Sequence, residues 1–164
     1  MAVITILGSG MMGSAMSYPA RANGNEVRLV GSPLDGASIE GLKKDDYHIT
    51  LKRTLPKGVK YYYIDELSQA LEGADLLISG VSSFGVDWFA NEILPILPDS
   101  LPILGITKGM FDMEDGSLVP YPVYYKSLPQ GKNKRFYAVG GPCTSYELAD
   151  LDPTEVAFCG DDIE

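Results

Sequence analysis

The stretch "AVITILGSGMMGSA", residues 2–15, decides the fold of this chain. It opens on an almost wholly apolar run, which is typical of a strand buried on both faces of a parallel sheet. Gly8, Gly10 and Gly13 then follow in the spacing G-x-G-x-x-G. The first glycine permits a tight turn, the second lets backbone approach a pyrophosphate, and the third lets helix and strand pack closely. The stretch therefore predicts a phosphate cradle for a dinucleotide, with a purely structural turn as the alternative.

The remaining chain repeats the same alternation of apolar strands and helices. Strands are expected at 26–30, 59–64, 76–83, 101–109, 135–141 and 155–160, and helices at 11–23, 65–75 and 85–97. Pro19 should kink the first helix because it removes a backbone donor. The polar region 35–58 is expected to be a loop with a short helix. This order predicts an α/β fold with a doubly wound, mostly parallel sheet, built by a single domain over residues 1–164.

The charge of the chain limits its partners. Lys and Arg number 13 against 22 Asp and Glu, a formal net charge of −9 over 164 residues. Nucleic acids and membrane surfaces select a basic face, so neither is expected as a partner. No apolar run is long enough for a membrane span, and no signal peptide is recognised. Cys143 and Cys159 have no metal-ligand spacing, so no metal is expected and a cytoplasmic location is indicated.

The end of the second expected strand usually distinguishes NAD from NADP. An acidic residue there holds the ribose 2′-hydroxyl of NAD, and a basic residue favours the 2′-phosphate of NADP. This chain has the neutral "GSP" at 31–33, where Ser32 can hydrogen-bond either form. Asp35 or the pair Lys43-Lys44 could decide, although two lysines on a solvated face are the simpler interpretation. Both NAD and NADP therefore remain candidate cofactors.

Three later loops are predicted to share the ligand edge with the glycine turn. They are "GVSS" (80–83), "ITKGM" (106–110) and "GGPCTSYEL" (140–148). Each has a structural alternative: Ser83 could cap a helix, Lys108 could be a surface lysine, and Thr144 or Ser145 could cap a helix with Glu147 in its first turn. His48, the one histidine, lies in the polar region and is expected to be solvated.

These segments together resemble one family. The pieces "ILGSGMMGSA", "NGNEVRLVGSP", "LPKGVKYYYIDELSQALEGADLLISGVSS", "ITKGM" and "GGPCTSYELADLDPTEVAF" match the N-terminal half of NAD(P)-dependent glycerol-3-phosphate dehydrogenase in order and spacing. The last two pieces are the most specific, and the matches cover nearly the whole chain. The resemblance implies a Rossmann-type fold and reversible hydride transfer between NAD or NADP and the carbon that differs between dihydroxyacetone phosphate and sn-glycerol 3-phosphate. It also implies a small phosphorylated substrate, a role in phospholipid biosynthesis, and a homodimer at full length.

The resemblance also assigns site residues. It implies cofactor contacts at Gly8, Ser9, Gly10, Met11, Met12, Gly13, Ser32, Ser82, Lys108 and Ser145, and substrate contacts at Lys108, Gly141 and Cys143. Departures from the family pattern are Cys143 for Ser or Thr, Ser145 for Ala, Ser82 for Pro, and the helix-interrupting Pro19. They affect the substrate assignment more than the cofactor assignment.

The family's general acid/base is a lysine in an A-L-K-N segment of a helical second domain, and this chain has no match to it. Lys132-Asn133 precedes an expected strand and is not that motif. The chain is therefore expected to be a fragment or the product of a split gene, with no catalytic acid/base of its own, binding NAD(P) without turnover. The alternatives are another Rossmann oxidoreductase, such as a ketopantoate reductase or opine-type dehydrogenase, and a stand-alone NAD(P)-binding sensor module.

Overall fold

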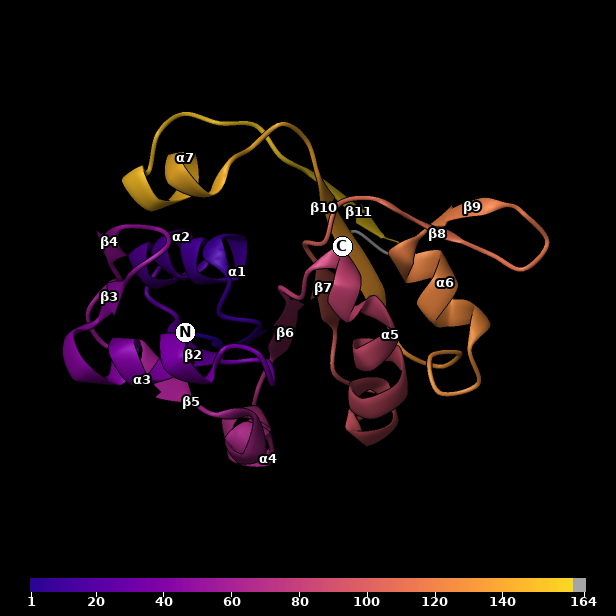
Figure 1. Ribbon diagram of the computed structural model, residues 1–164, viewed down its shortest axis with the longest axis horizontal. Helices are drawn as coiled ribbons and strands as arrows, with labels where there is room; N and C mark the ends of the chain where they lie inside the picture. Colours follow the sequence, from indigo (N-terminus) through magenta and orange to yellow (C-terminus); the bar gives the residue numbers. More distant parts are fainter. Residues whose placement is uncertain (161–164) are drawn as a thin grey trace.

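The computed structural model describes residues 1–160, and its centre is a seven-stranded sheet (Figure 1). The strand order is β11-β10-β7-β6-β1-β2-β5. The strands are β1 (Val3–Leu7), β2 (Glu26–Val30), β5 (Lys60–Tyr62), β6 (Leu76–Ser79), β7 (Ile103–Gly105), β10 (Phe136–Gly140) and β11 (Ala157–Gly160). All neighbouring pairs are parallel except β10 with β11, which is antiparallel. The doubly wound, mostly parallel sheet predicted from the sequence is confirmed.

Helices cover both faces of this sheet. They are α1 (Met11–Ala15), α2 (Ser17–Ala22), α3 (Gly36–Asp45), α4 (Leu67–Leu71), α5 (Val86–Trp88), α6 (Tyr121–Ser127) and α7 (Ser145–Asp150). Figure 1 shows α4 and α5 on the opposite side of the sheet from α1 and α2. Short 3-10 turns precede α4 and α5, at Ile64–Glu66 and Ser83–Gly85, and α5 continues through a π-helical turn (Phe89–Ile93) into a 3-10 turn (Leu94–Ile96).

Successive strand residues supply two separate cores, one on each face of the sheet. In β6, Leu77 faces the core covered by α4, α5 and α6, while Ile78 faces the core covered by α1 and α3. In β7, Ile103 likewise faces the first of these cores and Leu104 faces the second. Two-sided burial of a parallel sheet requires apolar residues at consecutive positions, which explains the unbroken apolar runs of the sequence.

Proline divides the first helix, as the sequence predicts. Met16 both ends α1 and begins α2, so the expected helix over 11–23 consists of two short helices. Pro19 has no N–H and cannot donate to the carbonyl of Ala15, which removes a hydrogen bond where the two helices meet. The helix expected at 85–97 is also irregular, because its α-helical part covers only Val86–Trp88.

Some elements differ from the sequence-based expectation. Two hairpins, β3–β4 (Tyr47–His48 with Arg53–Thr54) and β8–β9 (Met110–Asp112 with Leu118–Pro120), were not predicted, and neither was α6. Their strands are only two or three residues long, too short for alternation to be detected. The strand expected at 101–109 ends at Gly105, which leaves Lys108 in the loop that follows β7.

A pair of glycine variants tests the packing of the β1–α1 turn. A Cβ atom at Gly13 would overlap the carbonyl oxygen of Gly8, whereas one at Gly10 would meet nothing within 4 Å. We expect Gly13→Ala to lower the free energy of unfolding by about 3 kcal/mol through overpacking. The control Gly10→Ala should cost within about 1 kcal/mol. Urea denaturation followed by circular dichroism measures both, and equal stabilities of the two variants would contradict this account.

Candidate functional site

The turn between β1 and α1 is built from backbone packed directly on backbone. Gly8 has φ of +107°, and a Cβ atom there would lie 2.7 Å from the carbonyl oxygen of Gly80, at the end of β6. A Cβ atom at Gly80 would in turn lie 3.0 Å from the Cα of Gly13. These three glycines bring the start of α1 against the ends of β1 and β6. Larger side chains at these positions would force the segments apart.

Gly10 has a different role, because it faces open space. It begins α1 in an extended conformation, and no side chain caps the helix. The N–H groups of Met11 and Met12, in the first turn, therefore have no intrahelical acceptor. All three residues line a cavity of about 520 Å³. The turn thus presents unpaired backbone donors to a space large enough for a ligand, as a bound diphosphate requires.

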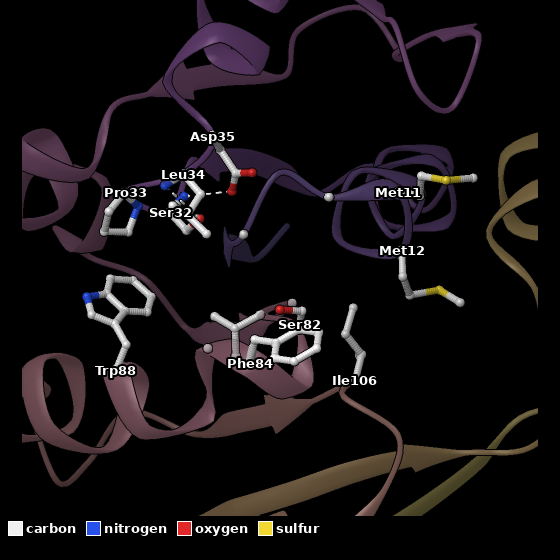
Figure 2. Close-up of a pocket in the computed structure, with 15 residues that line it drawn as sticks. Met11, Met12, Ser32, Pro33, Leu34, Asp35, Ser82, Phe84, Trp88 and Ile106 are labelled. Carbon is white, nitrogen blue, oxygen red and sulfur yellow. Dashed lines mark hydrogen bonds between the residues drawn. The ribbon is translucent and has the colours of Figure 1, made fainter.

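The cavity lies at the carboxyl ends of β1, β2 and β6. It is lined by Gly8, Gly10, Met11, Met12, Ser32, Pro33, Leu34, Asp35, Gly80, Val81, Ser82, Phe84, Gly85, Trp88 and Ile106. Figure 2 shows Ser32 to Asp35 on one side of it, Ser82 and Phe84 on the opposite side, and Met11 and Met12 at the right of the view. Parallel sheets bind ligands at the edge where strand order reverses, and here β1 lies between β2 and β6.

Six of the residues predicted to contact the cofactor line this cavity: Gly8, Gly10, Met11, Met12, Ser32 and Ser82. Two others, Ser9 and Gly13, are buried and do not line the cavity. Ser9 is 1% exposed, and its hydroxyl has no hydrogen-bond partner within the described structure. Ser9 and Gly13 therefore contribute to the conformation of the turn rather than to the surface of the cavity.

Lys108 lies in a second, adjoining groove of about 390 Å³ that shares Met12 and Ile106 with the first cavity. Its ammonium group donates to the carbonyl oxygens of Gly141, at 2.6 Å, and Cys143, at 3.0 Å. The loop after β7 is thereby tied to the loop after β10. The three residues predicted to contact substrate are thus brought together at one place.

The loop after β10 leads into α7 through a capping box. Thr144 accepts a hydrogen bond from the backbone of Glu147 through its hydroxyl, and the Glu147 carboxylate accepts from the N–H of Thr144 at 2.6 Å. Thr144 is therefore the cap, and Ser145 is a buried residue of the first helical turn. The thiol of Cys143 is also buried and lies 3.5 Å from the carbonyl oxygen of Thr144. The structural interpretation of Thr144 and Glu147 is confirmed.

His48 is buried, so the expectation of a solvated side chain is wrong. It is 3% exposed, and its Nε2 lies 2.8 Å from the carbonyl oxygen of Ser9. The N–H of Leu51 donates to Nδ1 at 3.0 Å. The polar sequence around His48 gave no sign of burial, because the contact depends on an unpredicted hairpin that folds back over the glycine turn.

Two of the side chains considered for cofactor choice, Asp35 and Lys43, have partners within the protein. Asp35 lines the cavity, and one of its carboxylate oxygens accepts from the N–H groups of Ser9, at 3.1 Å, and Ser32, at 2.8 Å. Lys43 forms an ion pair with Glu66 at 3.0 Å and lies over the ring of Tyr63. Neither Lys43 nor its neighbour Lys44 lines the cavity.

Two aromatic residues of the cavity were missed by sequence reasoning. Phe84 is 97% exposed, and Trp88 is partly buried in α5. The segment "GVDWFANEIL" predicts a helix but not the side that faces a ligand. Both residues line the cavity, and the ring of Phe84 lies almost wholly in solvent.

Within residues 1–160, no group of three or more His, Cys, Asp or Glu side chains could hold a metal ion. Over the same residues, no helix has the length and apolar character needed to cross a membrane.

A glycine turn with free backbone donors, set at the strand-order reversal of a parallel sheet, defines a dinucleotide-binding α/β domain. Sequence comparison identifies its family: residues 3–164 match the profile described as NAD-dependent glycerol-3-phosphate dehydrogenase N-terminus. The chain belongs to this family, rather than to the ketopantoate reductases or opine-type dehydrogenases.

Individual relatives agree with this assignment. The chain is 36% identical over 156 residues to the NADP(+)-dependent glycerol-3-phosphate dehydrogenase of Archaeoglobus fulgidus, covering 95% of this chain and 46% of that relative. Its fold is similar to glycerol-3-phosphate dehydrogenase from Coxiella burnetii, with a TM-score of 0.83 and 20% identity over 98% of this chain and 47% of that one. For the Plasmodium falciparum structure the TM-score is 0.82, with 23% identity over 99% and 46%. The chain thus spans about half the length of these relatives.

The capping box of α7 predicts an acid-dependent loss of stability. The backbone N–H of Thr144, its hydroxyl and the charge of Lys108 lower the pKa of Glu147 from its ordinary value of 4.5. Since the folded pKa lies below the unfolded one, Glu147 stabilises the fold above pH 4.5 and loses this contribution as pH falls through the folded pKa.

Glu147→Gln should therefore be less stable than the wild type at neutral pH, and its stability should fall less between about pH 5 and pH 3. Other carboxylates with lowered pKa values, such as Asp150, retain part of the slope. Thermal unfolding across this range measures the effect. Parallel curves for the two proteins would show that the capping carboxylate does not contribute.

Proposed function

We propose that this chain is the cofactor-binding domain of a glycerol-3-phosphate dehydrogenase. The reaction would interconvert sn-glycerol 3-phosphate and dihydroxyacetone phosphate with NAD or NADP. The observation that carries the proposal is the cavity lined by Gly10, Met11 and Met12, whose backbone donors have no acceptor in the helix. A cytoplasmic location and a homodimer at full length belong to the same proposal.

The residues present fit a dinucleotide. The donors of Met11 and Met12 would hold the diphosphate, and Ser32 would lie beside the adenosine ribose. Phe84 and Trp88 would cover the apolar faces of the rings. Backbone donors suit an anion in a protein of net charge −9, because they supply partial positive charge without a basic surface.

The substrate end would lie where the two cavities meet. Bound in this cleft, NAD(P) would supply a nicotinamide ring that accepts or gives a hydride. Lys108 would then hold the substrate oxygen or phosphate, since an ammonium has three donors and the described residues supply carbonyl acceptors for two of them. Gly141 and Cys143 would complete the substrate contacts by fixing the Lys108 side chain. The proton transfer itself would require a group from outside this chain.

Direct measurement of cofactor binding tests the proposal. When NADH or NADPH is titrated into the 164-residue chain, the fluorescence of the nucleotide, or energy transfer to it, should rise to saturation. The chain alone should not reduce dihydroxyacetone phosphate. Gly10→Val, which places a branched side chain in the open space of the cradle, is the binding-deficient control. Absence of binding for both nucleotides would overturn the cofactor assignment, and turnover by the isolated chain would overturn the assignment of proton transfer to another domain.

We expect that cofactor choice can be altered at Ser32. Asp35 is the charged side chain among the cavity residues, and no basic side chain there can meet a 2′-phosphate. Ser32→Arg should raise the affinity for NADPH relative to NADH by about tenfold, because a guanidinium binds phosphate with paired hydrogen bonds. Ser32→Gln is the neutral control of similar reach. An unchanged ratio of the two dissociation constants in Ser32→Arg would place the 2′ position elsewhere.

A further inference from the structure

His48 is a buried titratable side chain for which the proposed function gives no role. It lies in β3, outside the cavity, yet its ring nitrogen reaches the peptide that connects Ser9 to Gly10. A polar side chain buried to this degree is kept in place by its hydrogen bonds. Its partners therefore indicate what it does.

The hydrogen bonds fix the form of the ring. Leu51 donates its backbone N–H to Nδ1, so Nδ1 is the acceptor and carries no proton. The proton of the neutral imidazole is then on Nε2, which donates to the carbonyl oxygen of Ser9 at 2.8 Å. The hydroxyl of Ser14 reaches the same carbonyl at a longer distance, 3.3 Å. Of the two hydrogen bonds to this oxygen, the one from His48 is thus the shorter.

This contact sets the orientation of the glycine turn. The C=O and N–H of a trans peptide point in opposite directions, and no peptide bond of the described chain is cis. With the Ser9 carbonyl turned toward His48, the N–H of Gly10 points away from His48, and Gly10 is a residue that lines the cavity. Asp35 holds the N–H of Ser9 and thereby fixes the preceding peptide as well.

The hairpin that carries His48 is itself anchored at several points. Tyr18 donates from its hydroxyl to the carbonyl of Thr54 at 2.8 Å, connecting the hairpin to α2. Arg53 forms two hydrogen bonds with the carboxylate of Asp150 in α7, at 2.8 and 2.9 Å. The hairpin that places the imidazole against Ser9 is therefore held by hydrogen bonds to two helices.

We propose that His48 is a positioning residue of the dinucleotide site: its Nε2–H holds the Ser9 carbonyl so that the Gly10 peptide presents its N–H to the diphosphate. Loss of this donor leaves only the longer contact from Ser14 to hold the peptide. Glycine at position 10 then permits the rotated conformation without steric cost. The cavity keeps its volume, but the ligand loses an oriented donor. The inference rests on the proposed function, because it names a determinant of that same site.

Two substitutions separate the hydrogen bonds of the ring. His48→Gln keeps a donor near the place of Nε2 and loses the acceptor for Leu51, whereas His48→Asn keeps an acceptor near the place of Nδ1 and loses the donor to Ser9. We expect His48→Asn to bind NADH about tenfold more weakly than wild type, and His48→Gln to stay within about threefold. Unfolding midpoints of both variants monitor the fold. Equal losses of affinity, or losses that follow the midpoints, would overturn the proposal.

A measurement without any nucleotide tests the same point. His48 is the single histidine of the chain, so its ring signals in a long-range ¹⁵N–¹H NMR spectrum are assigned without ambiguity. The neutral form protonated at Nε2 is expected, and protonation at Nδ1 would overturn the proposal.

The binding experiment separates the two proposals. If the wild type binds no nucleotide, the proposed function fails. If the wild type binds and His48→Asn binds equally well, only the role of His48 fails.

Discussion

The close contact between the backbones of Gly8, Gly13 and Gly80 is the constraint on which the site depends. Side chains at these positions would collide with carbonyl oxygens or with the opposite Cα atom. Because the three segments meet without side chains between them, α1 begins directly above the ends of β1 and β6. The first-turn donors of α1 then face the cavity at the strand-order reversal.

In the proposed function, the site would recognise an anion through backbone more than through side chains. The proposed phosphate cradle consists of N–H groups, and the carboxylate of Asp35 accepts hydrogen bonds from two other backbone N–H groups. Lys108 similarly uses two of its donors to join the loops after β7 and β10. Charged side chains thus fix the loops at this edge of the sheet, which would let an acidic domain keep the proposed anion-binding surface.

The sequence predicted the parts of this architecture that depend on local pattern. Apolar runs located the strands of the sheet, the glycine spacing located the turn, and Pro19 indicated the interruption between α1 and α2. Contacts between distant segments could not be predicted from the sequence. The burial of His48 depends on a hairpin with strands two residues long, and the exposure of Phe84 depends on which side of the 83–88 segment faces the cavity. Neither leaves a periodic signal in the chain.

The placement of the dinucleotide in the cavity of the glycine turn is the central claim, and a ¹⁵N–¹H correlation spectrum of the labelled chain titrated with NADH tests it directly. Saturable shifts are predicted for the amides of Gly10, Met11, Met12, Ser32 and Phe84, with the remote β8–β9 hairpin unchanged. Shifts confined to other parts of the molecule, or amides of the turn that do not respond at saturating NADH, would contradict it.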